Sequence, residues 1–166
     1  MSTVSGDIEL EDAVCDTEVE TVSGDVEVRK QARTLEVETV SGDLELTEGA
    51  GTLLFESVSG DLELSGGPWE RVEAESVSGD LSLEGALAKN ARVELASHSG
   101  ELELALPADT SAELSATSFS GGIESDWGSP AGPKYGPGSS LEHTLGSGHG
   151  RVELTAFSGR VTVRQR

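Results

Sequence analysis

Hydrophobic and polar residues alternate in short runs along most of the chain, and these runs meet at a recurring Ser-Gly pair. Residues 35–39 read Leu-Glu-Val-Glu-Thr before one such pair, and residues 44–46 read Leu-Glu-Leu after it. A period of two residues predicts half-buried β-strands, because successive side chains of a strand point to opposite faces. We therefore expect a short strand on each side of every Ser-Gly bend.

The bend lies within an eight-residue phrase, Thr-Val-Ser-Gly-Asp-Leu-Glu-Leu at residues 39–46, which recurs along almost the whole chain. Its glycine recurs as Gly6, Gly24, Gly42, Gly60, Gly79, Gly100, Gly121 and Gly159. A period of roughly 20 residues is typical of stacked repeats, and it is too short for a strand–helix–strand unit, which needs about 30 residues. The repeat predicts an all-β fold, a parallel β-solenoid of about eight two-strand coils.

Alignment of the copies on their glycine predicts the core. Four columns are apolar: Ile8, Val26, Leu44, Leu62, Leu81, Leu102, Ile123 and Val161; Leu10, Val28, Leu46, Leu64, Leu83 and Leu104; Leu35, Leu53, Val72, Val93, Leu114 and Val152; and Val19, Val37, Phe55, Ala74, Leu95 and Leu154. A column of threonines and serines three places before the glycine is expected inside, where each hydroxyl can hydrogen-bond the adjacent backbone. The glycine is expected at a bend that needs a positive φ or lacks room for a Cβ atom.

The regularity changes along the chain, although a single domain is expected over residues 1–166. Residues 1–105 form regular coils, residues 106–150 form irregular coils with a Gly/Pro-rich capping loop, and residues 151–166 form a final coil. The looser turns, such as 47–51, 65–70 and 84–90, separate consecutive coils. Outward arginines in the final coil (Arg160, Arg164 and Arg166) are expected to make that end of the stack basic.

The acidic residues follow the same repeat. The formal net charge is −20, from 31 acidic and 11 basic residues. Stacking should place the acids in four columns: Asp7, Asp25, Asp43, Asp61, Asp80 and Glu101; Glu9, Glu27, Glu45, Glu63 and Glu103; Glu18, Glu36, Glu73 and Glu94; and Glu20, Glu38, Glu56 and Glu75. Neighbours about 4.8 Å apart repel by slightly less than about 1 kcal/mol in bulk water. Such charge argues against nucleic acid or an anionic membrane surface as a partner.

Two interpretations of the acidic columns stay open. The first is a solvated charged face that keeps an edge-rich β protein soluble, with a salt-rich or acidic habitat as a variant. The second is binding of Ca²⁺, which takes several carboxylate oxygens, with Asp25, Asp43, Asp61 and Asp80 as the candidate ligands. The phrase lacks the Gly-Gly-x-Gly-x-Asp spacing of calcium-binding nonapeptide repeats, and no other cofactor is expected.

The stretch 126–150 breaks the repeat and holds the candidate interaction residues Trp127, Tyr135 and His143. Glycoside hydrolysis needs two carboxyl groups about 5 to 9.5 Å apart, and Asp126 and Glu142 lie in this stretch. The acidic columns supply that spacing everywhere, however, so no catalytic residue is predicted. We expect Trp127 and Tyr135 to fold over the open end of the core as a hydrophobic cap.

The repeated Ser-Gly-Asp-aliphatic coils, the late Phe-Ser-Gly variant and the Gly-rich segment before a final strand–bend–strand unit carry a resemblance that spans essentially the whole chain. The chain resembles a bacterial family of β-strand repeats labelled as adhesins, also called the toastrack domain. The resemblance implies a β-solenoid, a place in the bacterial cell envelope, at the surface or in the periplasm, and no catalytic residues.

We therefore expect a non-enzymatic structural or interaction domain, an adhesin or envelope scaffold, whose partner is a protein or a cell-surface glycan. The alternative is a carbohydrate-binding or carbohydrate-active solenoid that uses the 126–150 loop. No apolar run of about 18 residues is present, so no membrane span is expected. The chain opens within a coil, without an export signal. We expect an upstream segment in the full protein, and self-association of this chain through its open N-terminal coil.

Overall fold

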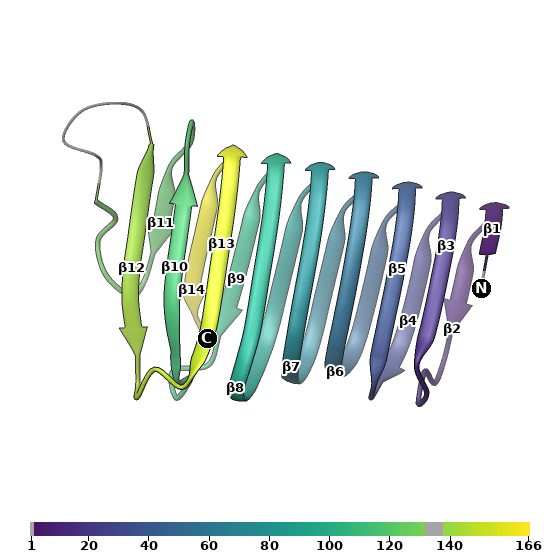
Figure 1. Ribbon diagram of the computed structural model, residues 1–166, viewed down its shortest axis with the longest axis horizontal. Coiled ribbons are helices and arrows are strands. Elements are labelled where there is room, and N and C mark those ends of the chain that lie inside the picture. Colours follow the sequence, from purple (N-terminus) through teal and green to yellow (C-terminus); the bar gives the residue numbers. More distant parts are fainter. Residues whose placement is uncertain (1, 132–137) are drawn as a thin grey trace.

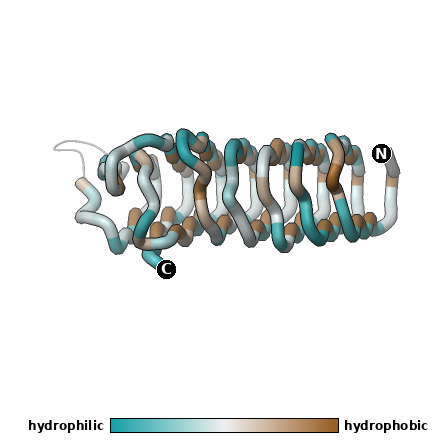
Figure 2. Tube along the Cα trace, turned by 90° about the horizontal axis from the view of Figure 1, so that it is seen from below, coloured by the Kyte–Doolittle hydropathy of each residue, from teal (hydrophilic) through white to brown (hydrophobic). Residues whose placement is uncertain are grey.

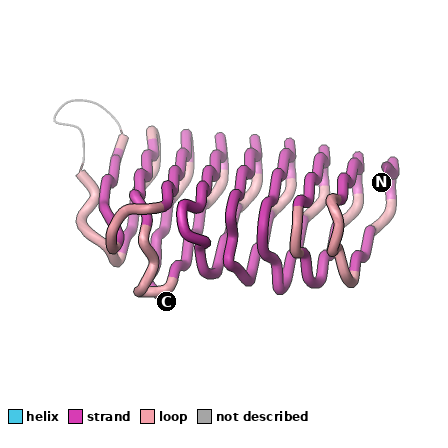
Figure 3. Tube along the Cα trace, turned by 60° about the horizontal axis from the view of Figure 1, so that its bottom comes forward, coloured by secondary structure: helices cyan, strands magenta, loops and turns pink. Residues whose placement is uncertain are grey.

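The computed structural model describes residues 2–131 and 138–166, and these residues form strands and connections without any helix (Figures 1 and 3). The fourteen strands are β1 (Ser2–Ser5), β2 (Ile8–Leu10), β3 (Thr17–Ser23), β4 (Val26–Gln31), β5 (Thr34–Ser41), β6 (Leu44–Ser59), β7 (Leu62–Ser78), β8 (Leu81–Ser99), β9 (Leu102–Leu106), β10 (Ala112–Ser118), β11 (Ile123–Ser125), β12 (Ser139–Leu145), β13 (Gly150–Ser158) and β14 (Val161–Gln165). The all-β solenoid expected from the repeat is confirmed.

Each coil contributes one strand segment to each of two faces, which we call face A and face B. Face A contains β1, β3, β5, the second halves of β6, β7 and β8, then β13, β10 and β12. Face B contains β2, β4, the first halves of β6, β7 and β8, then β9, β14 and β11. Figure 2 shows the two faces as parallel layers. The eight Ser-Gly bends join the faces along one edge, the upper edge of Figure 1, so the expected number of coils is confirmed.

The predicted turns at 47–51, 65–70 and 84–90 are part of the long strands β6, β7 and β8, which bend across the lower edge. Their pairing shifts in register there, between Leu46 and Thr52 and between Gly66 and Arg71. Trp69, expected in a turn, is fully buried there. Gly49 makes room for it, because a Cβ atom at Gly49 would collide with the Trp69 ring. This wider edge therefore holds an aromatic core residue that the alternation of the short strands did not predict.

The order of the coils in space differs from their order in the sequence. β13 pairs in parallel with β8 on one side and with β10 on the other, and β14 likewise lies between β9 and β11. The coil at 151–166 is therefore inserted between two earlier coils, as Figure 1 shows in yellow between two green coils. The expectation that this coil forms one end of the stack is wrong.

The end of the stack opposite β1 is formed by β10, β11 and β12. β12 pairs with β10 in the antiparallel sense, from Ala112 opposite Leu145 to Ser118 opposite Ser139, so one strand of the fold is not parallel. Leu141 and Leu145 of β12 are buried, and Trp127 is partly buried against the same core. Trp127 thus packs against the core, whereas Tyr135 lies outside the described residues, and the cap expected from these two residues stays a prediction.

The predicted core columns are buried at 0–6% exposure, except Ile8 and Leu10 in the first coil, which are half-buried. The glycine of the bend is required by close stacking, since a Cβ atom at Gly42 would collide with the backbone of Gly24. The Thr/Ser column is buried, but the hydroxyls of Thr21, Thr39, Ser57 and Ser76 have no hydrogen-bond partner. Among the described members of the column, Ser97 and Ser118 donate to the glycine carbonyl of the neighbouring coil, at 3.4 and 2.9 Å.

Candidate functional site in a groove along the upper edge

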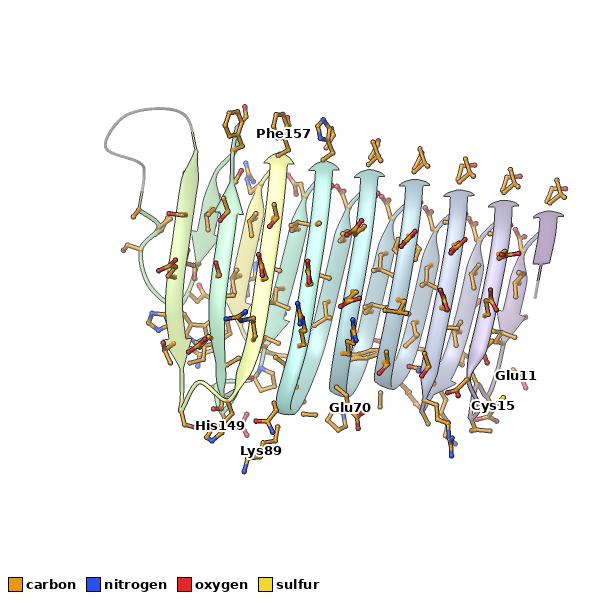
Figure 4. All side chains as sticks on the ribbon, in the orientation of Figure 1. Glu11, Cys15, Glu70, Lys89, His149 and Phe157 are labelled. Carbon is orange, nitrogen blue, oxygen red and sulfur yellow. The ribbon has the colours of Figure 1, made fainter. Side chains whose placement is uncertain are left out.

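A continuous row of apolar side chains is exposed along the upper edge of face A. The residue two places before each bend glycine points outward, because the Thr or Ser before it points into the core. We call this row the apolar ridge; in spatial order it consists of Val4, Val22, Val40, Val58, Val77, His98, Phe157 and Phe119. The valines and phenylalanines are 48–75% exposed. Figure 4 shows Phe157 at the tip of β13, within this row.

The inserted coil makes one end of the apolar ridge aromatic. The rings of His98 and Phe157 stack with centroids 4.7 Å apart, and those of Phe157 and Phe119 stack at 5.0 Å. His98 comes from β8, Phe157 follows the core residues of β13, and Phe119 follows β10. These three rings meet only because 151–166 lies between the coils that carry His98 and Phe119. His98 is therefore an exposed member of an aromatic stack.

A second row, four glutamates that we call the glutamate ridge, runs parallel to the apolar ridge two residues earlier on each strand. It consists of Glu20, Glu38, Glu56 and Glu75, and its positions continue as Ala96 and Thr155 toward the aromatic end. The buried Thr/Ser column forms the floor between the two ridges. Together they line an open groove of about 690 Å³ that extends from Val4 to Phe157. We call it the edge groove.

The edge groove is apolar along one wall and negatively charged along the other. In the described chain, none of the four glutamates of the glutamate ridge has a Lys or Arg nitrogen within 4.0 Å. Two arginines of face A instead contact the next glutamate column: Arg71 contacts Glu73, and Arg92 contacts Glu94. The glutamate ridge is thus left with unneutralised charge facing the groove.

Face B carries the aspartate column that was considered for calcium. Each Asp Oδ1 accepts a hydrogen bond from the backbone N–H of the equivalent residue in the next coil: Asp25 from Asp43 at 3.1 Å, Asp43 from Asp61 at 2.8 Å, and Asp61 from Asp80 at 2.8 Å. The column therefore satisfies backbone donors at the bend. Within residues 2–131 and 138–166, no three His, Cys, Asp or Glu side chains converge as a metal site would require. Calcium binding at Asp25, Asp43, Asp61 and Asp80 stays a prediction.

Ion pairs on face B involve the inserted coil. Arg164 contacts Glu103 of β9 at 3.1 Å, Arg160 contacts Glu124 of β11 at 3.7 Å, and Arg166 contacts Glu84 at 2.6 Å. These arginines lie between acidic coils instead of forming a basic end of the stack, which corrects the expectation from the sequence. Near the other end, the hydrogen bond and charge of Glu27 raise the pKa of Arg29.

The candidate residues of 126–150 do not form one site. His143 on β12 lines a shallow polar depression with Glu113, Glu142 and Arg151, whereas Trp127 packs against the core and is not part of its lining. Tyr135 lies outside the described residues. His149 is at the lower edge in Figure 4, on the opposite side from Phe157, where its Nδ1 contacts the hydroxyl of Ser147. The geometry does not bring the aromatic and carboxylate candidates together.

Comparison with known proteins identifies the family. The family model described as Toastrack DUF4097 matches residues 1–164. The chain belongs to this family. No curated protein and no solved structure matches the chain at the level required for significance. Among the described residues, no helix is long and apolar enough to cross a membrane.

Sequence reasoning missed the edge groove, although the signal was present. The strict alternation that places Thr39 inside also places Val40 and Glu38 outside, on the same face. Valine occupies this outward-facing position in five successive copies, as Val4, Val22, Val40, Val58 and Val77. A column of hydrophobic residues at outward-facing register is the sign that would have identified this surface in the Toastrack sequence.

Proposed function

We propose that this Toastrack chain is a non-enzymatic interaction module of the bacterial envelope, an adhesin-type scaffold that binds segments of partner proteins along its edge groove. The observation that supports this proposal is the exposed, unbroken apolar ridge. Single exposed apolar residues are common on soluble proteins, but a contiguous row beside a groove is typical of an interaction site.

The rigidity of the scaffold supports the same function. Every strand beneath the groove, except at the two ends of the stack, is hydrogen-bonded to a neighbouring coil on both sides. The groove walls therefore keep their spacing without a partner, which lowers the entropic cost of binding because the surface is already ordered. A one-dimensional stack of this kind presents an extended surface, as repeat proteins generally do.

The proposal is tested by selecting from a displayed library of random peptides against the purified chain. Two double variants serve as filters: Val40→Ser with Val58→Ser in the apolar ridge, and Glu45→Gln with Glu63→Gln as a matched control on face B. We expect enriched peptides that lose binding to the valine variant and keep it with the control. No enrichment, or peptides that bind the valine variant equally well, would overturn the proposal.

The partner class and the compartment have separate tests. If the chain binds glycans on an array and the valine double variant loses that binding, the partner is a carbohydrate and not a protein. Fractionation of the producing bacterium, with detection of the chain in envelope or cytosolic fractions, tests the envelope assignment. Recovery in the cytosol alone would remove the adhesin-type role while leaving the groove as a binding site.

A further inference from the structure

We infer that the occupant of the edge groove is a cationic amphipathic α-helix of a partner protein, lying along the axis of the stack; this inference rests on the proposed function and specifies its partner. The charge of the groove is the first argument. One wall is apolar and the other carries Glu20, Glu38, Glu56 and Glu75, whose carboxylates face no described cation within 4.0 Å. A complementary segment needs an apolar stripe with Lys or Arg beside it.

The period of the groove favours a helix over an extended strand. Neighbouring coils are about 4.8 Å apart, so the five valines of the apolar ridge span roughly 19 Å. Same-face residues of an α-helix recur about every 5.4 Å, and over four steps they drift from the valines by roughly 2 Å, which side chains can absorb. Same-face residues of a strand recur about every 6.8 Å and would drift by roughly 8 Å.

The width of the groove gives the cations their place. The glutamate ridge is two residues from the apolar ridge along each strand, which corresponds to about 6.8 Å. A helix about 10–12 Å in diameter that seats its apolar stripe on the valines therefore projects a flanking Lys or Arg over the glutamates. Long basic side chains can lay their methylene groups across the floor of the groove while the charge reaches the carboxylates.

A second copy of this chain is a poorer occupant. Two apolar ridges that met face to face would bring two glutamate ridges together, and each chain carries a net charge of −20. Like charges at such a contact oppose binding.

The aromatic end of the ridge, with His98, Phe157 and Phe119, has Ala96 and Thr155 opposite it instead of glutamates. We expect the partner helix to be apolar or aromatic, not basic, at that end.

The test uses synthetic peptides of about 18 residues that carry leucines at helical spacing and lysines on the flanks. The controls are a scrambled peptide of identical composition and a helix with glutamate in place of lysine. Binding is measured by fluorescence anisotropy at several salt concentrations to the wild-type chain, to Glu38→Gln with Glu56→Gln, and to the matched face B pair Glu45→Gln with Glu63→Gln. All substituted residues are exposed, and thermal melts confirm that each variant folds.

We expect the cationic helix to bind and the two control peptides to bind at least about tenfold more weakly. Loss of Glu38 and Glu56 should weaken binding by about two- to thirtyfold, as for two exposed ion pairs, and should reduce its salt dependence. The Glu45 and Glu63 variant should change it less than twofold. The inference of a cationic helix would be overturned if the scrambled peptide bound equally well, or if the two pairs of Glu→Gln substitutions changed the affinity equally. A display selection could return peptides that depend on the groove but lack the helical pattern of apolar and basic residues. That result would overturn the inference of a cationic helix and leave the proposed function intact.

Discussion

Replacement of Gly60 by alanine tests whether close stacking of the bends holds the solenoid together. Gly60 has no positive φ in the range that disfavours other residues, so alanine is not excluded by its backbone conformation. The obstacle is the neighbouring coil, because a Cβ atom at Gly60 would lie well under 3.0 Å from the carbonyl oxygen of Gly42. Relief of this overlap requires the two bends to separate by about 1 Å.

The cost follows from what this separation disturbs. The Gly42 N–H donates to Ser59 O at 3.2 Å, and the Asp61 N–H donates to Asp43 Oδ1 at 2.8 Å across the same pair of coils. Overpacking in a tight interior costs about 1–3 kcal/mol, and each weakened hydrogen bond adds about 0.5–1.5 kcal/mol. We expect Gly60→Ala to lower the free energy of unfolding by about 3 kcal/mol. For a chain of this length that corresponds to a fall in Tm of roughly 6–12 °C.

Gly122 provides the matched control. It follows the bend glycine Gly121, has no positive φ in the disfavoured range, and a Cβ atom there would meet nothing within 4 Å. Gly122→Ala should be neutral or stabilise by about 0.4–1 kcal/mol, because it restricts the unfolded chain. Thermal melts followed by far-UV circular dichroism compare both variants with the wild-type chain. A Gly60→Ala protein that melts within about 2 °C of the wild type would refute the stacking argument.

Four further predictions follow from the same geometry. Asp43→Ala should be less stable than Asp43→Asn by about 1 kcal/mol, measured by urea denaturation, because both lose the charge but only asparagine keeps the acceptor for the Asp61 N–H; equal stability would show that the acceptor contributes nothing. The Tm should rise with NaCl, because salt screens the repulsion along the acidic columns. If screening is the whole effect, millimolar CaCl₂ raises the Tm no further than NaCl at equal ionic strength, and a larger rise would show that calcium binds. Deletion of residues 151–166 should lower the Tm by more than about 10 °C, because it removes a coil from within the stack; a loss as small as that from trimming residues 1–10 would contradict the inserted order. Self-association through the first coil, where Ile8 and Leu10 are half-buried, should appear in light scattering at high protein and high salt, and a strict monomer there would exclude it.

The sequence predicted the coils because their determinants are local and repeated. Alternation decides which side chains point inward, so Leu44 and Leu62 are buried as expected. The bend glycine was also predictable, since one backbone contact recurs in every copy after the first. The aspartate that follows it was interpreted as a surface charge, because a carboxylate that accepts a backbone N–H from the next coil has the same sequence signature as one in solvent.

The order of the last coils was not predictable from the repeat alone, because any two copies of the phrase can pair. Gly121 and Gly159 carry similar contexts, Ser-Phe-Ser-Gly and Ala-Phe-Ser-Gly, and the repeat does not distinguish them, although it is Gly159 that stacks on Gly100. The distinguishing information is non-local: Arg160 and Arg164 find acidic neighbours on both sides only when their coil lies inside the stack. The edge groove depends on the same arrangement, since its aromatic end is assembled from β8, β13 and β10.

The inserted coil also determines when the stack can be completed during synthesis of the chain. Coils through β9 can stack in the order in which they leave the ribosome, but β10 and β11 reach their final neighbours only after residues 150–166 have emerged. At about 5–20 residues per second, the 60 residues from the end of β9 at 106 to 166 take roughly 3–12 s. During that interval β8 and β9 lack their partners β13 and β14, so that N–H and C=O groups at their edges are unpaired. A nascent chain that stalls in this stretch therefore exposes an unpaired strand edge to chaperones and proteases, whereas in a chain that includes residues 150–166 this edge is paired.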